Sequence, residues 1–122
     1  MNKNNILIGY LQCAVFADAP DEFSGEQVSV NSENFTPESI ETSKSDIEQF
    51  VQSNKKLLEE SCIDDYQIGH DFWLTRNGHG VGFWDRNIGE AGDQIADAIN
   101  SNFKEVNLER LVDGTYRVGY KM

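Results

Sequence analysis

The chain has 122 residues, of which 39% are hydrophobic and 25% are charged, and its formal net charge at pH 7 is −11. Such a chain is long enough for one domain with a hydrophobic core and too hydrophobic to be wholly disordered. The acidic balance argues against direct binding of nucleic-acid phosphates, because proteins that do this present a basic surface.

The charge is unevenly distributed between two parts of the chain. Residues 1–69 carry 13 acids and four lysines and are predicted to be mostly helical, whereas residues 70–122 carry eight acids and six bases. No apolar stretch approaches the about 20 residues of a membrane-spanning helix, and we expect no signal peptide. We therefore predict a cytoplasmic protein, in which Cys13 and Cys62 are reduced, buried thiols.

The first element is predicted over residues 4–16. Ile6 and Cys13 fall on one apolar surface at helical spacing, whereas the alternation typical of a strand is broken at Gln12. We therefore favour a helix over a strand for this segment.

Two connecting segments are also predicted in the acidic part. Residues 18–34 form a loop in which Val28 and Val30 could add a short edge strand, and residues 61–69 form a connector that ends at Gly69. The acidic residues of the connector show no spacing typical of a metal site, so no metal ligand is assigned.

A long helix is predicted between these connectors, from Pro37 to about residue 60. Thr36 caps it and proline occupies its first turn. Apolar residues repeat at helical spacing on one face. The opposite face is polar and mostly negative, and is either a solvated surface or a docking surface for a cationic partner. The candidate docking residues are Glu38, Glu41, Glu48 and Glu59.

The segment from His70 to Arg86 holds both tryptophans, both histidines and two of the four arginines. It predicts a β-hairpin, because Asn77-Gly78 suits a type I′ turn, in which both central residues need positive φ. This turn places Phe72 opposite Phe83 on an apolar face. The other face collects Asp71, Trp73, Thr75, Gly80, Gly82 and Trp84.

The tryptophan-bearing face of this hairpin has two interpretations. Either helices cover it and the indoles belong to the core, or it is an open surface that stacks on a ligand or partner. His70 lies opposite Asp85, but no Ser or Cys nucleophile is placed beside them, so we assign no catalytic residue or cofactor and do not expect an enzyme. The ligand or partner candidates are His70, Asp71, Trp73, Arg76, Trp84, Asp85 and Arg86.

The remainder predicts an amphipathic helix over residues 87–104 and a second hairpin over residues 106–120. The hairpin loop is residues 112–114, with Gly114 in the left-handed conformation. Its register pairs Val106 with Tyr120, Leu108 with Val118, and Glu109 with Arg117. The predicted fold is therefore α+β: an antiparallel sheet built from two β-hairpins flanking a helix, covered by N-terminal helices.

Residues 69–86 have the sequence Gly-His-Asp-Phe-Trp-Leu-Thr-Arg-Asn-Gly-His-Gly-Val-Gly-Phe-Trp-Asp-Arg. This run resembles the signature of a family of small uncharacterised proteins of tailed bacteriophages and prophages. Residues 10–16 and 88–93 also match the layout of that family, although Phe16 stands where the family is expected to have tryptophan. The resemblance implies a phage-derived accessory protein in the host bacterial cytoplasm. It implies no established activity.

Two functions follow from these observations. The first is a non-enzymatic protein that binds a host protein, such as a defence or nucleic-acid-handling factor, through an acidic surface. The second is a domain that binds a small ligand or nucleotide, with or without catalysis, at the 70–86 hairpin. Homo-oligomers could form if the last strand pairs with a second copy at its edge.

Overall fold

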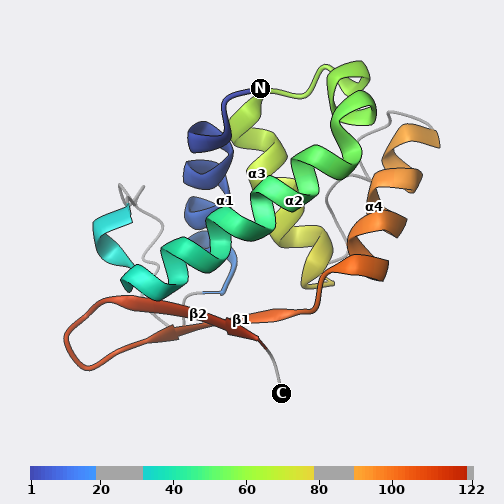
Figure 1. Cartoon of the computed structure of the whole chain (residues 1–122). Coiled ribbons are helices and arrows are strands. Elements are labelled where there is room, and N and C mark those ends of the chain that lie inside the picture. The colour runs from blue at the N-terminus through green and yellow to red at the C-terminus, as the bar shows by residue number, and fades with distance from the viewer. Residues whose placement is uncertain (19–31, 79–89, 121–122) are drawn as a thin grey trace.

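The computed structural model describes residues 1–18, 32–78 and 90–120 (Figure 1). Within these ranges, four α-helices and a two-stranded antiparallel sheet make an α+β fold, and no helix is long and apolar enough to cross a membrane. The elements in chain order are α1 (Lys3–Asp18), the 3₁₀ turn η1 (Ser32–Asn34), α2 (Pro37–Ser61), α3 (Asp65–Arg76), α4 (Glu90–Asn102), β1 (Val106–Arg110) and β2 (Tyr116–Tyr120).

The helices surround α3, and the hairpin lies across one end of them (Figure 1). α1 packs along α3, α2 crosses in front of both, and α4 lies on the other side of α3. An aromatic cluster fills the space between the helices. Phe50 of α2 stacks on Phe72 of α3 with ring centroids 4.3 Å apart, and Tyr10 of α1 meets Trp73 of α3 edge-on at 5.1 Å.

Two glycines allow the backbones of α1 and α3 to touch. A Cβ atom added at Gly9 would lie 2.0 Å from the carbonyl oxygen of Tyr66, and one added at Gly69 would lie 2.0 Å from that of Ile6. No side chain fits at such distances, so glycine is required at both positions. The prediction that Gly69 ends a connector was wrong, because it lies inside α3 at this contact.

The hairpin predicted from His70 to Arg86 was wrong in its first strand, because residues 70–76 belong to α3. A strand would place Phe72 and Trp73 on opposite faces of a sheet. Both are fully buried instead, since α3 has neighbours on several sides. The proposed return strand, residues 79–86, lies outside the described residues.

Local hydrogen bonds explain where α3 begins and ends. The Asp64 side chain accepts a bond from the backbone N–H of Gln67 at 3.0 Å, which caps the first turn. At the other end, the N–H groups of Asn77 and Gly78 donate to carbonyl oxygens of the last helical turn. Gly78 has a φ of 68°, so the Asn-Gly pair that predicted a hairpin turn ends a helix here.

The helices predicted for residues 4–16 and 37–60 are confirmed as α1 and α2, and the described part of residues 87–104 contains α4. Thr36 caps α2 as predicted, since its hydroxyl accepts from the N–H of Ser39 at 3.3 Å. α2 is kinked at Asn54, whose φ of −124° is not helical. Val28 and Val30, the proposed edge strand, lie outside the described residues.

The C-terminal hairpin has the predicted register. β1 and β2 pair Val106 with Tyr120, Leu108 with Val118, and Glu109 with Arg117. The loop closes where the N–H of Leu111 donates to the carbonyl of Thr115 at 2.7 Å, and Gly114 has the expected positive φ, 91°. The Ser39 hydroxyl also accepts a 2.8 Å bond from the N–H of Val118, which joins the hairpin to α2.

Candidate functional site

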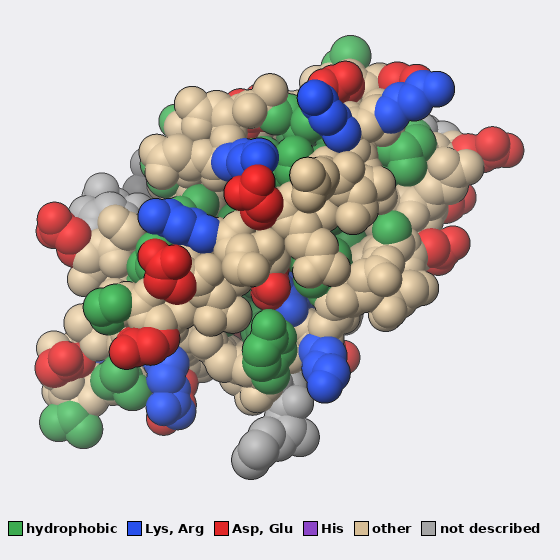
Figure 2. Space-filling view, in the orientation of Figure 1, with side chains coloured by type: hydrophobic (Ala, Val, Ile, Leu, Met, Phe, Trp, Pro, Cys, Tyr) green, Lys and Arg blue, Asp and Glu red, His purple; other side chains and the backbone are tan. Residues whose placement is uncertain are grey.

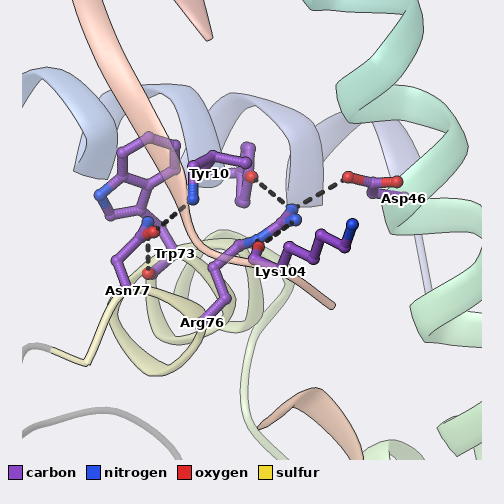
Figure 3. A network of polar contacts seen from close by, with 7 residues as sticks. Tyr10, Asp46, Trp73, Arg76, Asn77 and Lys104 are labelled. Atoms are coloured by element: carbon purple, nitrogen blue, oxygen red, sulfur yellow. Dashed lines mark hydrogen bonds and ion pairs between the residues drawn. The ribbon is translucent and has the colours of Figure 1, made fainter. Parts of the chain in front are cut away.

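The side chain of Arg76 lies at the centre of a buried polar network (Figure 3). Its Nε and Nη2 atoms donate to the carbonyl oxygen of Lys104 at 2.9 and 2.7 Å. Nη1 donates to the hydroxyl of Tyr10 and to Oδ2 of Asp46, each at 3.0 Å. One side chain therefore joins α3 to α1, to α2 and to the segment that links α4 to the hairpin.

The surroundings of Arg76 suit a buried cation. The rings of Phe72 and Phe103 lie 5.3 and 5.5 Å from the guanidinium carbon, a range typical of cation–π contacts. The Asp46 carboxylate supplies the opposite charge. Burial raises the pKa of Tyr10 from 10.0 to about 12, although the Arg76 charge opposes this, so the phenol stays neutral at ordinary pH.

A groove opens beside this network, between α2 and the C-terminal hairpin. It consists of two hollows of about 190 and 540 Å³, and both are lined by Asp46 and Tyr120. Figure 2 shows an acidic and a basic side chain recessed near the middle of this face. The smaller hollow is also lined by Tyr10, Thr42, Ser43, Val106, Val118 and Gly119. The larger is also lined by Gln49, Arg76, Asn102, Phe103 and Lys104.

Ser43 is the unusual residue of this groove. Its side chain is only 2% exposed, and its hydroxyl has no hydrogen-bond partner among the described residues. A buried hydroxyl without a partner costs free energy, so native proteins usually supply one. Ser43 and Asp46 lie three residues apart on α2, which places both side chains on the same side of the helix.

The residues predicted from the sequence for a recognition surface are mostly buried. Asp71 and Trp73 are fully buried, and Arg76 is 3% exposed, while His70 is half-buried. The indole N–H of Trp73 donates to the carboxylate of Asp18, and Asp71 accepts a 2.9 Å bond from the amide of a glutamine on the preceding turn. The open interpretation is therefore wrong for Trp73, which belongs to the core.

The other candidates of that surface, Trp84, Asp85 and Arg86, lie outside the described residues. The network and groove bring together residues that the sequence did not single out: Tyr10, Ser43, Asp46, Lys104 and Tyr120. These residues come from α1, α2, the segment between α4 and β1, and the hairpin, so no local motif marks them. Of the candidates predicted from the sequence, only Arg76 belongs to the network, where it pairs with Asp46.

The two cysteines differ in their surroundings. Both are free, but Cys13 is buried and Cys62 is exposed, so the prediction of two buried thiols was wrong for Cys62. Burial, with smaller effects of Asp18 and Asp71, raises the pKa of Cys13 from 9.0 to about 12. The Cys13 thiol therefore stays protonated and is a poor nucleophile at neutral pH.

The candidate docking residues on α2 are exposed but lie among lysines. Glu38, Glu41, Glu48 and Glu59 are all exposed. Lys44 and Lys55 occupy the same side of the helix, and Glu48 pairs with Lys3 at 2.8 Å. Figure 2 shows acidic and basic side chains mixed along α2. Its glutamates therefore do not make a continuous acidic surface.

α4 has a more uniform charge. Glu90, Asp93 and Asp97 are exposed and recur at intervals of three and four residues, so they share one face. The helix contains no Lys or Arg. Acidic side chains line the right-hand edge of the molecule over α4 in Figure 2. We call these three residues the α4 acidic face.

Comparison of the chain with models of protein families, with curated protein sequences and with solved structures found no match. Among the described residues, no group of three or more His, Cys, Asp or Glu side chains could hold a metal ion. The surface and the groove are therefore the features of the described residues that bear on function.

Proposed function

We propose that this protein is a non-enzymatic interaction protein that binds a basic partner protein through its acidic surface. The observation that carries the proposal is the α4 acidic face, Glu90, Asp93 and Asp97, exposed on a helix without Lys or Arg. Three carboxylates along one helical face attract cationic side chains and speed encounter with a basic surface. The net charge of −11 acts in the same direction.

The glutamates of α2 form a second, weaker contact in this proposal. They are exposed, but the nearby lysines reduce the negative potential that a partner would meet. We therefore place the main docking surface on α4 and assign a supporting role to Glu38, Glu41, Glu48 and Glu59.

The origin of the partner follows from the resemblance to tailed-bacteriophage proteins. We propose that the partner is a protein of the bacterial host, such as a defence factor or a protein that handles nucleic acid. A nucleic-acid-binding protein would offer the basic surface that the α4 acidic face requires.

Affinity capture with matched charge variants tests this function. One variant carries Glu90→Gln, Asp93→Asn and Asp97→Asn, and its control carries Glu38→Gln, Glu41→Gln and Glu59→Gln. Both changes raise the net charge from −11 to −8. From a bacterial lysate, we expect the unchanged protein to retain one basic protein that is released by salt, the α2 variant to retain less of it, and the α4 variant to lose it.

Two results would contradict the proposal. If the two triple variants lose captured proteins to the same extent, net charge rather than the α4 acidic face governs binding. If no discrete basic protein is retained by the unchanged chain at low salt, the protein has no partner of the proposed kind in that host.

The alternative, a ligand-binding domain centred on residues 70–86, is weakened by the core position of Trp73. Stacking on a ligand requires an open ring face, and this indole has none. We therefore do not propose that segment as the functional surface.

A further inference from the structure

We propose that the groove between α2 and the C-terminal hairpin binds a small organic anion, with its carboxylate or phosphate group beside Lys104 and Arg76. The proposal rests on the groove's own groups and is independent of the α4 acidic face.

The charge of the groove favours an anion, even though the whole protein is acidic. The ionic groups that line it are Asp46, Arg76 and Lys104. Asp46 and Arg76 pair at 3.0 Å and largely cancel each other. Lys104 has an exposed side chain with no ion pair among the described residues, so it leaves one uncompensated positive charge at the larger hollow.

Two buried donors that line the groove have no acceptor for one hydrogen among the residues that the structure describes. Arg76 has five N–H groups and makes four hydrogen bonds to described residues, so one N–H of Nη2 has no acceptor among them. The hydroxyl of Ser43 has no partner in the smaller hollow. Carboxylate and phosphate oxygens accept hydrogen bonds from guanidinium and ammonium groups more strongly than neutral acceptors do.

The shape of the groove indicates that the anion has an uncharged portion. The two hollows meet at Asp46 and Tyr120, so a ligand with its charged group at Lys104 can extend past the Tyr120 ring toward Ser43. Tyr120 lines both hollows and is 53% exposed, so an aromatic ligand could stack on its ring there. An aromatic acid or aryl phosphate has this combination of features.

A titration followed by amide NMR shifts tests the proposal with four defined probes: inorganic phosphate, phenyl phosphate, benzoate and the neutral benzamide. We expect saturable shifts for Ser43, Gln49, Asn102 and Tyr120 with phenyl phosphate or benzoate. A response to only one of them identifies the preferred charged group. Inorganic phosphate should bind more weakly than phenyl phosphate, since it cannot reach the ring.

Three variants separate a specific site from general charge effects. Lys104→Gln should weaken binding about 10- to 100-fold, because it removes the charged donor. Lys44→Gln makes the same charge change on an exposed residue outside the groove and should have no effect. Ser43→Ala should not lower the urea midpoint, since it removes an unpartnered buried hydroxyl and no hydrogen bond to a described residue is lost, but it should weaken binding about two- to tenfold.

Each alternative result would overturn the proposal. Absence of saturable groove shifts with both aryl anions means that the groove binds no such ligand. Equal binding of benzamide, or equal weakening by Lys44→Gln and Lys104→Gln, means that the positive charge of the groove does not select the ligand. Spectra of the free variants that match the unchanged protein exclude misfolding as the cause of weakened binding.

Discussion

The guanidinium of Arg76 shows how this small protein accommodates a buried charge. Removing a cation from water is expensive, and the cost is offset only when a counter-charge and hydrogen bonds replace the solvent. Asp46 provides the counter-charge, and the Lys104 carbonyl accepts two further bonds. Because its partners come from different elements, Arg76 fixes where those elements meet and shapes the floor of the groove.

The backbone contact at Gly69 leads to a prediction about adding a single methyl group there. We expect Gly69→Ala to lower the free energy of unfolding by about 1–3 kcal/mol or more, because its Cβ would collide with the backbone of Ile6. Gly119→Ala is the control, since no atom lies within 4 Å of its added Cβ. Urea unfolding measures both, and equal stabilities would show that α1 and α3 are not in backbone contact.

The buried thiol and phenol predict sensitivity to alkali. The pKa values of Cys13 and Tyr10 are raised to about 12, so the folded protein holds these protons more tightly than the unfolded chain does. Their contribution to stability is complete below about pH 9, and it falls as the pH rises from about 9 to 12. We expect the urea midpoint to fall over this range.

Cysteine variants identify the source of that decline. Cys13→Ala should make the fall between pH 9 and 10 shallower, because only the thiol has an ordinary pKa near 9. Cys62→Ala removes an exposed thiol and should leave the pH dependence unchanged. If the Cys13→Ala profile is parallel to that of the unchanged protein, the thiol is not protected by folding.

At the scale of elements, α3 explains why a helix resembled a hairpin in the sequence. Hydrophobic periodicity reveals a helix only when one face is polar. α3 is covered on several sides, so adjacent residues such as Phe72 and Trp73 are both buried. Its sequence therefore does not show the alternation of apolar and polar residues that marks a helix with one exposed face. Asn77-Gly78 added a second misleading signal, because the same dipeptide suits a hairpin turn and a helix end.

The cap of α3 provides a test at this scale. Asp64→Ala should lower the free energy of unfolding by about 0.5–2 kcal/mol, because the N–H of Gln67 loses its acceptor. Asp97→Ala is a matched control on an exposed position inside α4, where alanine is a good helix former. Equal urea midpoints for the two variants would show that Asp64 does not begin a helix.

At the scale of the whole molecule, the predictions from sequence succeeded where signals were local. The Thr36-Pro37 start of α2 and the Asp113-Gly114 turn of the hairpin depend on neighbouring residues, and both are confirmed. The groove could not be predicted in this way. Ser43 and Lys104 both line the groove but lie about sixty residues apart in the sequence. Their positions in space depend on how α2 and the hairpin pack.

The glycine contact between α1 and α3 also has a consequence for synthesis on the ribosome. α1 is translated first, but its partner is complete only after nearly sixty more residues. At about 5–20 residues per second, the apolar surface of α1 waits several seconds for α3. During that interval the apolar residues of α1 have no α3 to pack against, so this segment is the one most exposed to non-native association while the chain is being made.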